Sequence, residues 1–99
     1  MAQVVLSESL RDDFDRIFDF LFEHAPETAA YRIETIITAL DILESSPLIG
    51  RPVDNGKREL VIATGASGYL ALYQYVPELD TAFVLAVRSQ RELGFGKTE

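Results

Sequence analysis

Three segments near the C-terminus decide the fold: RELVIAT at residues 58–64, YLALYQYV at 69–76 and TAFVLAVR at 81–88. Each is rich in β-branched or aromatic residues, as strands are, and each is apolar on both of its alternating faces. In the third segment, alternation predicts two opposite sets, Phe83, Leu85 and Val87 against Ala82, Val84 and Ala86. Strands that are apolar on both faces normally lie between two covering layers. We therefore expect a sheet that needs a cover on each side.

The segments between these strands are short and rich in turn-forming residues. GASG at residues 65–68 and PELD at 77–80 predict tight turns, so the three strands should form an antiparallel meander. Upstream of the strands, residues 47–57 contain prolines and glycines without a regular period. They predict an irregular connection that leads into the first strand of the meander.

The N-terminal half predicts a short strand and two helices. Residues 3–6 form the strand, and Ser7 or Ser9 is expected to cap a first helix that ends near His24. Apolar residues recur in that helix every three or four positions, at Leu10, Phe14, Ile17, Phe18 and Leu21. Pro26 starts a second helix that extends to about residue 45. The short break between the helices predicts an antiparallel helical hairpin.

Together these elements predict one α+β domain over residues 1–99, in the order β-α-α-β-β-β. An antiparallel sheet is packed on one face by the helical hairpin, and residues 96–99 are expected to fray. Because one hairpin covers only one face, the other face is left for a partner molecule. Self-association, or a fold that hides both faces internally, is the alternative.

Charge and composition restrict the function classes. Of the 99 residues, ten acidic and three basic ones precede Pro47 and six of each follow it, so the first half carries the whole net charge of −7. Strong direct binding to nucleic acid is therefore not expected. Without cysteine, neither a disulfide nor a thiolate metal site can form. No apolar run has the length of a signal peptide or a membrane span, so a cytoplasmic protein is expected.

The chain offers few groups for chemistry. The arginines Arg58, Arg88 and Arg91 can contact phosphate or carboxylate groups, since a guanidinium presents a fixed fork of donors. In a meander, the start of one strand and the end of the last lie apart, so Arg58 is expected to be distant from the other two. Pairing of these arginines with acids such as Glu92 is the structural alternative. We interpret His24 as structural, and no metal site or cofactor is expected.

Four patterns occur in order along nearly the whole chain: a helix led by Ser7, SPLIGRP at residues 46–52, GYLALY at 68–73 and RSQRE at 88–92. In this order they resemble the ParE/RelE family of bacterial toxins, which includes plasmid stabilisation proteins. The resemblance implies the toxin half of a type II toxin–antitoxin module, held inactive by a cognate antitoxin. One branch of the family cleaves ribosome-bound mRNA, and another poisons DNA gyrase.

The details are closer to the ParE branch. The nuclease branch typically has an arginine after the Gly-Tyr pair, where this chain has Leu70, and a histidine or tyrosine near the end of the last strand or in the tail. Here those places offer Ser89 and Phe95. RNA cleavage needs a base, an acid and cations. We therefore expect a protein that binds its target through Arg88 and Arg91, with gyrase as the suggested target and no assigned catalytic residue.

The resemblance also assigns the two faces of the strand at residues 69–76. Tyr69, Tyr73 and Tyr75 would face the hairpin, and the antitoxin would bind an open face that contains Leu70, Leu72 and Gln74. A homodimer and a toxin–antitoxin hetero-oligomer both stay open. So do two other functions: a ribosome-dependent mRNA endonuclease that uses the three arginines, and an inactive orphan that only binds an antitoxin.

Overall fold

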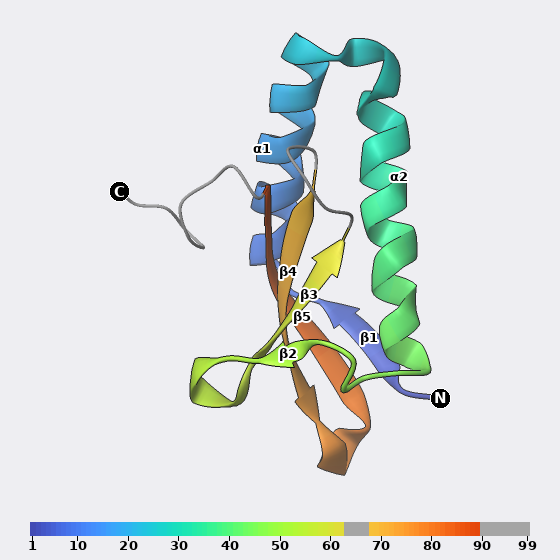
Figure 1. Ribbon diagram of the computed structural model, residues 1–99, viewed down its shortest axis with the longest axis vertical. Helices are drawn as coiled ribbons and strands as arrows, with labels where there is room; N and C mark the ends of the chain where they lie inside the picture. Colours follow the sequence, from blue (N-terminus) through green and yellow to red (C-terminus); the bar gives the residue numbers. More distant parts are fainter. Residues whose placement is uncertain (63–67, 90–99) are drawn as a thin grey trace.

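The computed structural model describes residues 1–62 and 68–89. Its helices and strands are β1 (Gln3–Leu6), α1 (Ser9–His24), α2 (Ala29–Leu40), β2 (Arg51–Pro52), β3 (Arg58–Ile62), β4 (Tyr69–Val76) and β5 (Thr81–Ser89). Short 3-10 helices span Pro26–Thr28, Asp41–Glu44, Asp54–Gly56 and Pro77–Leu79. The α+β class and the order of the main elements are as predicted (Figure 1).

The strands form one sheet in the order β1-β5-β4-β3-β2. The antiparallel meander of β3, β4 and β5 is confirmed. The sheet is not wholly antiparallel, however, because β1 pairs in parallel with the first half of β5. The two-residue strand β2 lies in the connection predicted to be irregular and pairs with the start of β3. The strand predicted at residues 58–64 reaches Ile62 in the described part, and residues 63–64 lie outside it.

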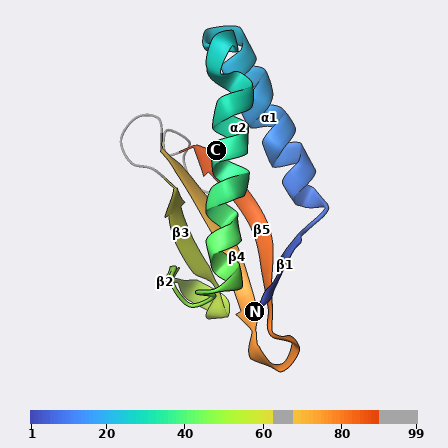
Figure 2. The ribbon, with the colours of Figure 1, turned by 90° about the vertical axis from the view of Figure 1, so that its right-hand side faces the viewer.

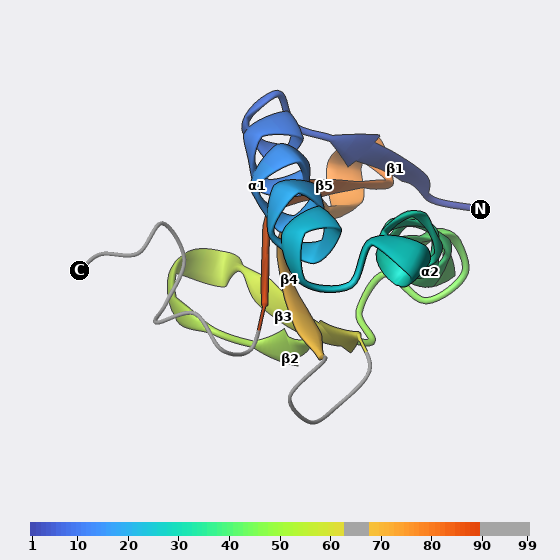
Figure 3. The same ribbon diagram turned by 90° about the horizontal axis from the view of Figure 1, so that it is seen from above.

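The two helices lie side by side on one side of β3 and β4, which confirms the helical hairpin (Figures 1 and 3). Their apolar stripes meet the sheet in a core that includes Leu10, Ile17, Leu21, Ile36, Leu40, Leu60, Ile62, Ala71 and Val84. Figure 2 shows that the turn of the hairpin extends beyond the ends of the strands. The core still reaches toward this end of the hairpin, where Leu21 and Ala29 are buried.

The second helix reaches Glu44, close to its predicted end, although it is α-helical only as far as Leu40 and continues from there as a 3-10 helix. The prediction of a serine cap on the first helix is wrong. At the start of α1, Glu8 is the N-cap and no side chain caps it. The hydroxyls of Ser7 and Ser9 instead donate to the carbonyl oxygen of Leu85, at 3.3 and 3.2 Å. The two hydroxyls thus bond a carbonyl far away in the sequence and do not cap the amides of the helix.

A β-bulge in β5 changes the predicted pattern of its faces. Leu72 pairs with Ala86 but Tyr73 pairs with Val84, so Leu85 is an extra residue. Strict alternation predicted Val87 on the face opposite Val84. That prediction is wrong, because the extra residue turns Val87 back to the helix side, where it is fully buried in the core.

The connection between α2 and β3 is held by Tyr73, whose side chain is fully buried (0% exposed) on the covered face. Its hydroxyl accepts a hydrogen bond from the Gly50 amide (2.9 Å) and donates one to the Pro47 carbonyl (2.8 Å). Arg58 donates to the carbonyls of Leu48 and Gly50, at 3.2 and 2.7 Å. A Cβ at Gly50 would lie only 2.7 Å from the Tyr73 ring, so glycine is required there.

Candidate functional site

The candidate site is the face of the sheet that the helices do not cover, called the open face below. It consists of side chains that alternate with the core residues of β3, β4 and β5: Glu59, Val61, Leu70, Leu72, Gln74, Phe83, Ala86 and Arg88. Val61 is 47% exposed, whereas its neighbour Ile62 on the covered face is 3% exposed. Within one protomer, most of the open face is half-buried or exposed, and Leu70 is its buried member.

The three residues predicted to bind the antitoxin are not equally accessible. Leu72 and Gln74 are half-buried, but Leu70 is only 8% exposed. Leu70 lies between Val61 of β3 and Arg88 of β5, its partners across the sheet. Leu70 therefore offers little surface area to a partner, and it can only pack beneath the residues that do. All three tyrosines predicted to face the hairpin lie in or against the core, as the resemblance implied.

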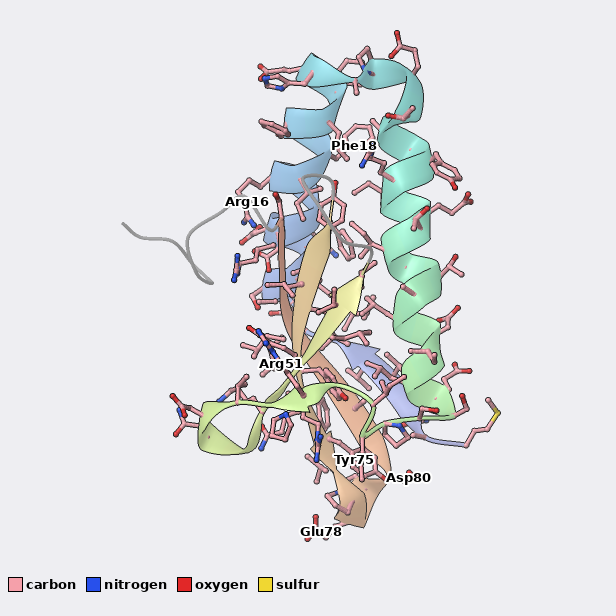
Figure 4. The ribbon with its side chains drawn as sticks, viewed as in Figure 1. Arg16, Phe18, Arg51, Tyr75, Glu78 and Asp80 are labelled. Atoms are coloured by element: carbon pink, nitrogen blue, oxygen red, sulfur yellow. The ribbon has the colours of Figure 1, made fainter. Side chains whose placement is uncertain are left out.

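The open face also carries an ion pair that the sequence analysis missed. Arg51 of β2 pairs with Glu59 of β3, at 3.0 Å from Nε and 2.6 Å from Nη2 to the same carboxylate oxygen. The Glu59 side chain is only 12% exposed, while Arg51 extends into solvent (Figure 4). The alternation of β3 could have predicted that Glu59 shares a face with Val61. The position of Arg51 opposite Glu59 could not be predicted, because a two-residue strand is too short to show a period in the sequence. This edge of the face is polar.

The structure separates two of the three candidate arginines. Arg58 pairs with Tyr73 across the sheet and so points to the covered side, where it holds the carbonyls of Leu48 and Gly50. Arg88 pairs with Leu70 and so points to the open face. The two guanidiniums are on opposite faces of the sheet. Arg91 lies outside the described residues.

Other groups that could support chemistry are engaged in local structure. The His24 ring stacks on Phe20, with 4.1 Å between ring centroids, and its Nδ1 lies 2.8 Å from the Phe20 carbonyl oxygen. Across residues 1–62 and 68–89, no three histidine or acidic side chains gather closely enough to hold a metal ion. In the same part of the chain, no helix has both the length and the apolarity to span a membrane.

Comparisons with known proteins agree with this architecture. Residues 4–94 match a family profile described as the ParE toxin of the type II toxin–antitoxin system parDE. Among curated proteins, Toxin RelE3 of Caulobacter vibrioides is 28% identical over 93% of this chain and 98% of its own length. Toxin RelE1 of the same organism is 35% identical over 72% of this chain and 76% of its own length.

A solved structure shares the fold. A chain of the chromosomal ParDE toxin–antitoxin system from P. aeruginosa superposes with a TM-score of 0.76, at 19% identity, over 90% of this chain and 96% of that one. At this identity the likeness concerns the fold alone. It supports the arrangement of two helices on a five-stranded sheet.

Proposed function

Since the chain belongs to the ParE toxin family of type II toxin–antitoxin systems, we propose that it arrests bacterial growth by binding a protein target, with DNA gyrase as the candidate. The single observation that carries this proposal is the chemistry of the open face. Val61 and Leu72 give it apolar area, Arg88 gives it a cation, and none of its described residues is a histidine or a tyrosine. A face of this kind suits protein binding better than proton transfer.

Arg88 is the proposed contact with the target, together with Arg91 on the strength of the sequence alone. A guanidinium beside apolar side chains such as Leu70 and Ala86 can bind a carboxylate in a fixed, bidentate geometry. Contacts of this kind, surrounded by apolar area, often dominate the binding energy of protein interfaces. The proposal places the protein in the cytoplasm and includes a role in plasmid stabilisation.

Growth and supercoiling assays test the proposal. Expression of the chain without an antitoxin should stop growth, and the purified protein should inhibit DNA supercoiling by gyrase while leaving ribosome-bound message intact. Arg88→Ala should weaken both effects about tenfold or more, as loss of a central arginine contact does. Arg11→Ala, which removes the same charge from the exposed surface of α1, is the matched control and should change neither.

The neutralising partner is proposed to be a cognate antitoxin that covers the open face. An amphipathic helix can lie over Leu72, Gln74 and Val61, and an added strand can pair with the outer edge of β3. Among the described strands, β2 pairs only with Arg58 and Glu59, so residues 60–62 keep that edge available. The antitoxin is expected in the adjacent gene, as a small protein with a DNA-binding N-terminus and an amphipathic C-terminus.

Because the chain itself is acidic, apolar burial should hold this complex together. The dissociation constant should then change little between low and high salt, since salt mainly screens exposed charges. A steep loss of affinity with added salt would show that charge pairs dominate the interface. Leu72→Asp places a charge in the middle of the surface and should weaken the complex tenfold or more, whereas Asp12→Ala on α1 should not.

A second function, ribosome-dependent cleavage of mRNA, is favoured by the two curated relatives that are named RelE toxins. In this function the arginines would bind phosphate. A translation extract separates the two: cleavage of ribosome-bound message by the purified chain, lost in Arg91→Ala, would establish the nuclease. Normal growth at high expression would instead indicate an inactive member that only binds an antitoxin.

A further inference from the structure

The second half of β5 has an unusual neighbour along its outer edge. β1 pairs with β5 only from Thr81 to Val84. Beyond that point the edge is occupied by side chains from the start of α1, and Figure 4 shows Arg16 of that helix beside the end of β5. A helix thus lies where the sheet would otherwise continue, and the backbone groups of this edge need partners from it.

The contacts from Ser7 and α1 to this edge fall on alternate residues of β5, as the hydrogen bonds of a neighbouring strand would. The Leu85 carbonyl accepts bonds from the Ser7 and Ser9 hydroxyls. Two residues on, the Val87 amide donates to Oδ2 of Asp13 at 3.0 Å, and the Val87 carbonyl accepts from Nη2 of Arg16 at 3.3 Å. Asp13 and Arg16 also pair with each other at 3.0 Å. The donor and the acceptor of Val87 are both satisfied by this one ion pair.

These contacts lie at the bulge that decides where Arg88 points. If β5 kept strict alternation through Leu85, with no bulge, Arg88 would lie on the covered face with Ala82 and Val84, and Val87 would lie on the open face. With the bulge, Val87 is buried in the core and Arg88 lies opposite Leu70 on the open face. Bulges commonly redirect a side chain in this way.

The Asp13 contact is the shortest of these side-chain contacts to β5, at 3.0 Å against 3.2–3.3 Å for the others. A carboxylate that accepts from a backbone amide forms a charge-assisted bond, which is shorter and stronger than a neutral one. The Asp13 side chain is only 19% exposed, so water competes weakly for it. Asp12, its neighbour in sequence, is exposed on the helix surface. The two adjacent aspartates therefore differ in environment, although both contribute the same charge.

We propose that Asp13, supported by Arg16, is a positioning residue that takes the place of a β-strand at the edge of β5, holds the bulged register and thereby aims Arg88 at the open face. The functional part of this inference rests on the proposed role of Arg88 in target binding. The structural part concerns only the direction of Arg88 and the protection of the Val87 amide.

The test compares Asp13→Ala with Asp12→Ala in the full chain. In Asp13→Ala, amide exchange at Val87 measured by NMR should accelerate tenfold or more, while exchange at Leu60 in β3 stays unchanged. The nuclear Overhauser contact between Arg88 and the Leu70 methyls should weaken at the same time. Growth arrest at matched soluble protein should fall as it does in Arg88→Ala. Asp12→Ala should match the wild type in every measurement, and Asp13→Asn, which keeps an acceptor oxygen, should be intermediate.

The outcomes separate this inference from the proposed function. A wild-type chain that fails to arrest growth would refute the proposed function, yet the exchange rate and the Arg88–Leu70 contact would still test the positioning. If Asp13→Ala keeps Val87 protected and Arg88 beside Leu70, or arrests growth fully with Val87 unprotected, the positioning role is wrong. If Asp13→Ala does not fold, Ser9→Ala removes another bond to the bulge and must accelerate exchange at Val87 for the inference to stand.

Discussion

The two faces of the sheet are similar in apolar content but differ in what covers them. On β3, Ile62 is enclosed by the helical hairpin, while Val61 remains exposed one residue away. The covered face is closed further by the connection that Tyr73 and Arg58 hold in place. On the open face, Arg51 and Glu59 form an ion pair at one edge. Alternation in the strands therefore identifies two faces with apolar side chains. Which of the two becomes part of the core depends on where the helices and the connection before β3 pack.

The largest expected difference between the faces is in the loss of stability when a glycine is replaced by alanine, at Gly50 and at Gly56. A Cβ at Gly50 would lie 2.7 Å from the Glu59 carbonyl oxygen and 2.7 Å from the Tyr73 ring on the covered side. Gly50→Ala should lower the free energy of unfolding by about 3 kcal/mol or more, since a packed core and a fixed backbone cannot yield. Urea unfolding followed by circular dichroism measures this.

Gly56 provides the matched control. The nearest atom to a Cβ added at Gly56 would be the side-chain nitrogen Nε2 of Gln74, at 3.8 Å, so space is available. Its φ of +73° still penalises a side chain, and Gly56→Ala should cost about 1–2 kcal/mol. Equal losses at the two positions would show that the connection at Gly50 is looser than its contacts indicate.

The second prediction compares neighbouring residues on β3 directly. Ile62→Ala should cost about 2–5 kcal/mol because it opens a cavity in the core. Val61→Ala should cost less than about 1 kcal/mol, mainly through the lower strand propensity of alanine. Chemical denaturation of both variants measures the difference. A large loss at Val61 would mean that the open face is packed within the protomer, and the proposed binding surface would then disappear.

Much of the covered face could be predicted from the sequence. Helical spacing from Leu10 to Leu21 identified most of the side of α1 that enters the core, although Phe18 of the predicted stripe is 39% exposed. The turn segments predicted the meander. These features depend on local periodicity, which each segment carries by itself. The assignment of the tyrosines to the covered face came instead from the family resemblance, since alternation alone does not say which face meets the helices.

The arrangement around β5 could not be predicted in the same way. The bulge at Leu85, the bonds of Ser7 and Ser9 to it and the role of Asp13 all depend on contacts between residues more than 70 positions apart. Ser7 and Ser9 have the local signature of helix caps, but their hydroxyls bond the distant Leu85 carbonyl and cap nothing. Asp13 and Asp12 look alike in the sequence, and only the fold distinguishes them.

The third prediction tests the hydroxyl that closes the covered face. Tyr73→Phe leaves the Gly50 amide and the Pro47 carbonyl without their buried partner, which should cost about 1–3 kcal/mol. Tyr75→Phe removes a hydroxyl that donates to Asp80 near the surface, and its effect should stay below about 1 kcal/mol. Thermal melts of the two variants measure the contrast. Equal losses of stability in the two variants would mean that the hydrogen bonds of Tyr73 are no more protected from water than the bond of Tyr75 at the turn.

The smallest effect concerns Tyr75 and Asp80, which meet at the turn between β4 and β5 (Figure 4). The Tyr75 hydroxyl donates to Asp80 at 2.6 Å, and this bond, with the negative charge of Asp80, raises the pKa of Tyr75 above its ordinary value. The bond favours the neutral phenol. Its contribution to stability is therefore complete below the ordinary tyrosine pKa of about 10 and is lost as the pH rises through the higher folded value.

An NMR titration of the Tyr75 ring measures this shift. In the wild type, Tyr75 should titrate above the ordinary tyrosine pKa of about 10. In Asp80→Asn the pKa of Tyr75 should fall toward the ordinary value, because the charge is lost while asparagine still tolerates the left-handed backbone, φ +46°, at this position. If Tyr75 titrates alike in the wild type and in Asp80→Asn, the turn is open in solution, and the ordered part of the covered face ends before Tyr75.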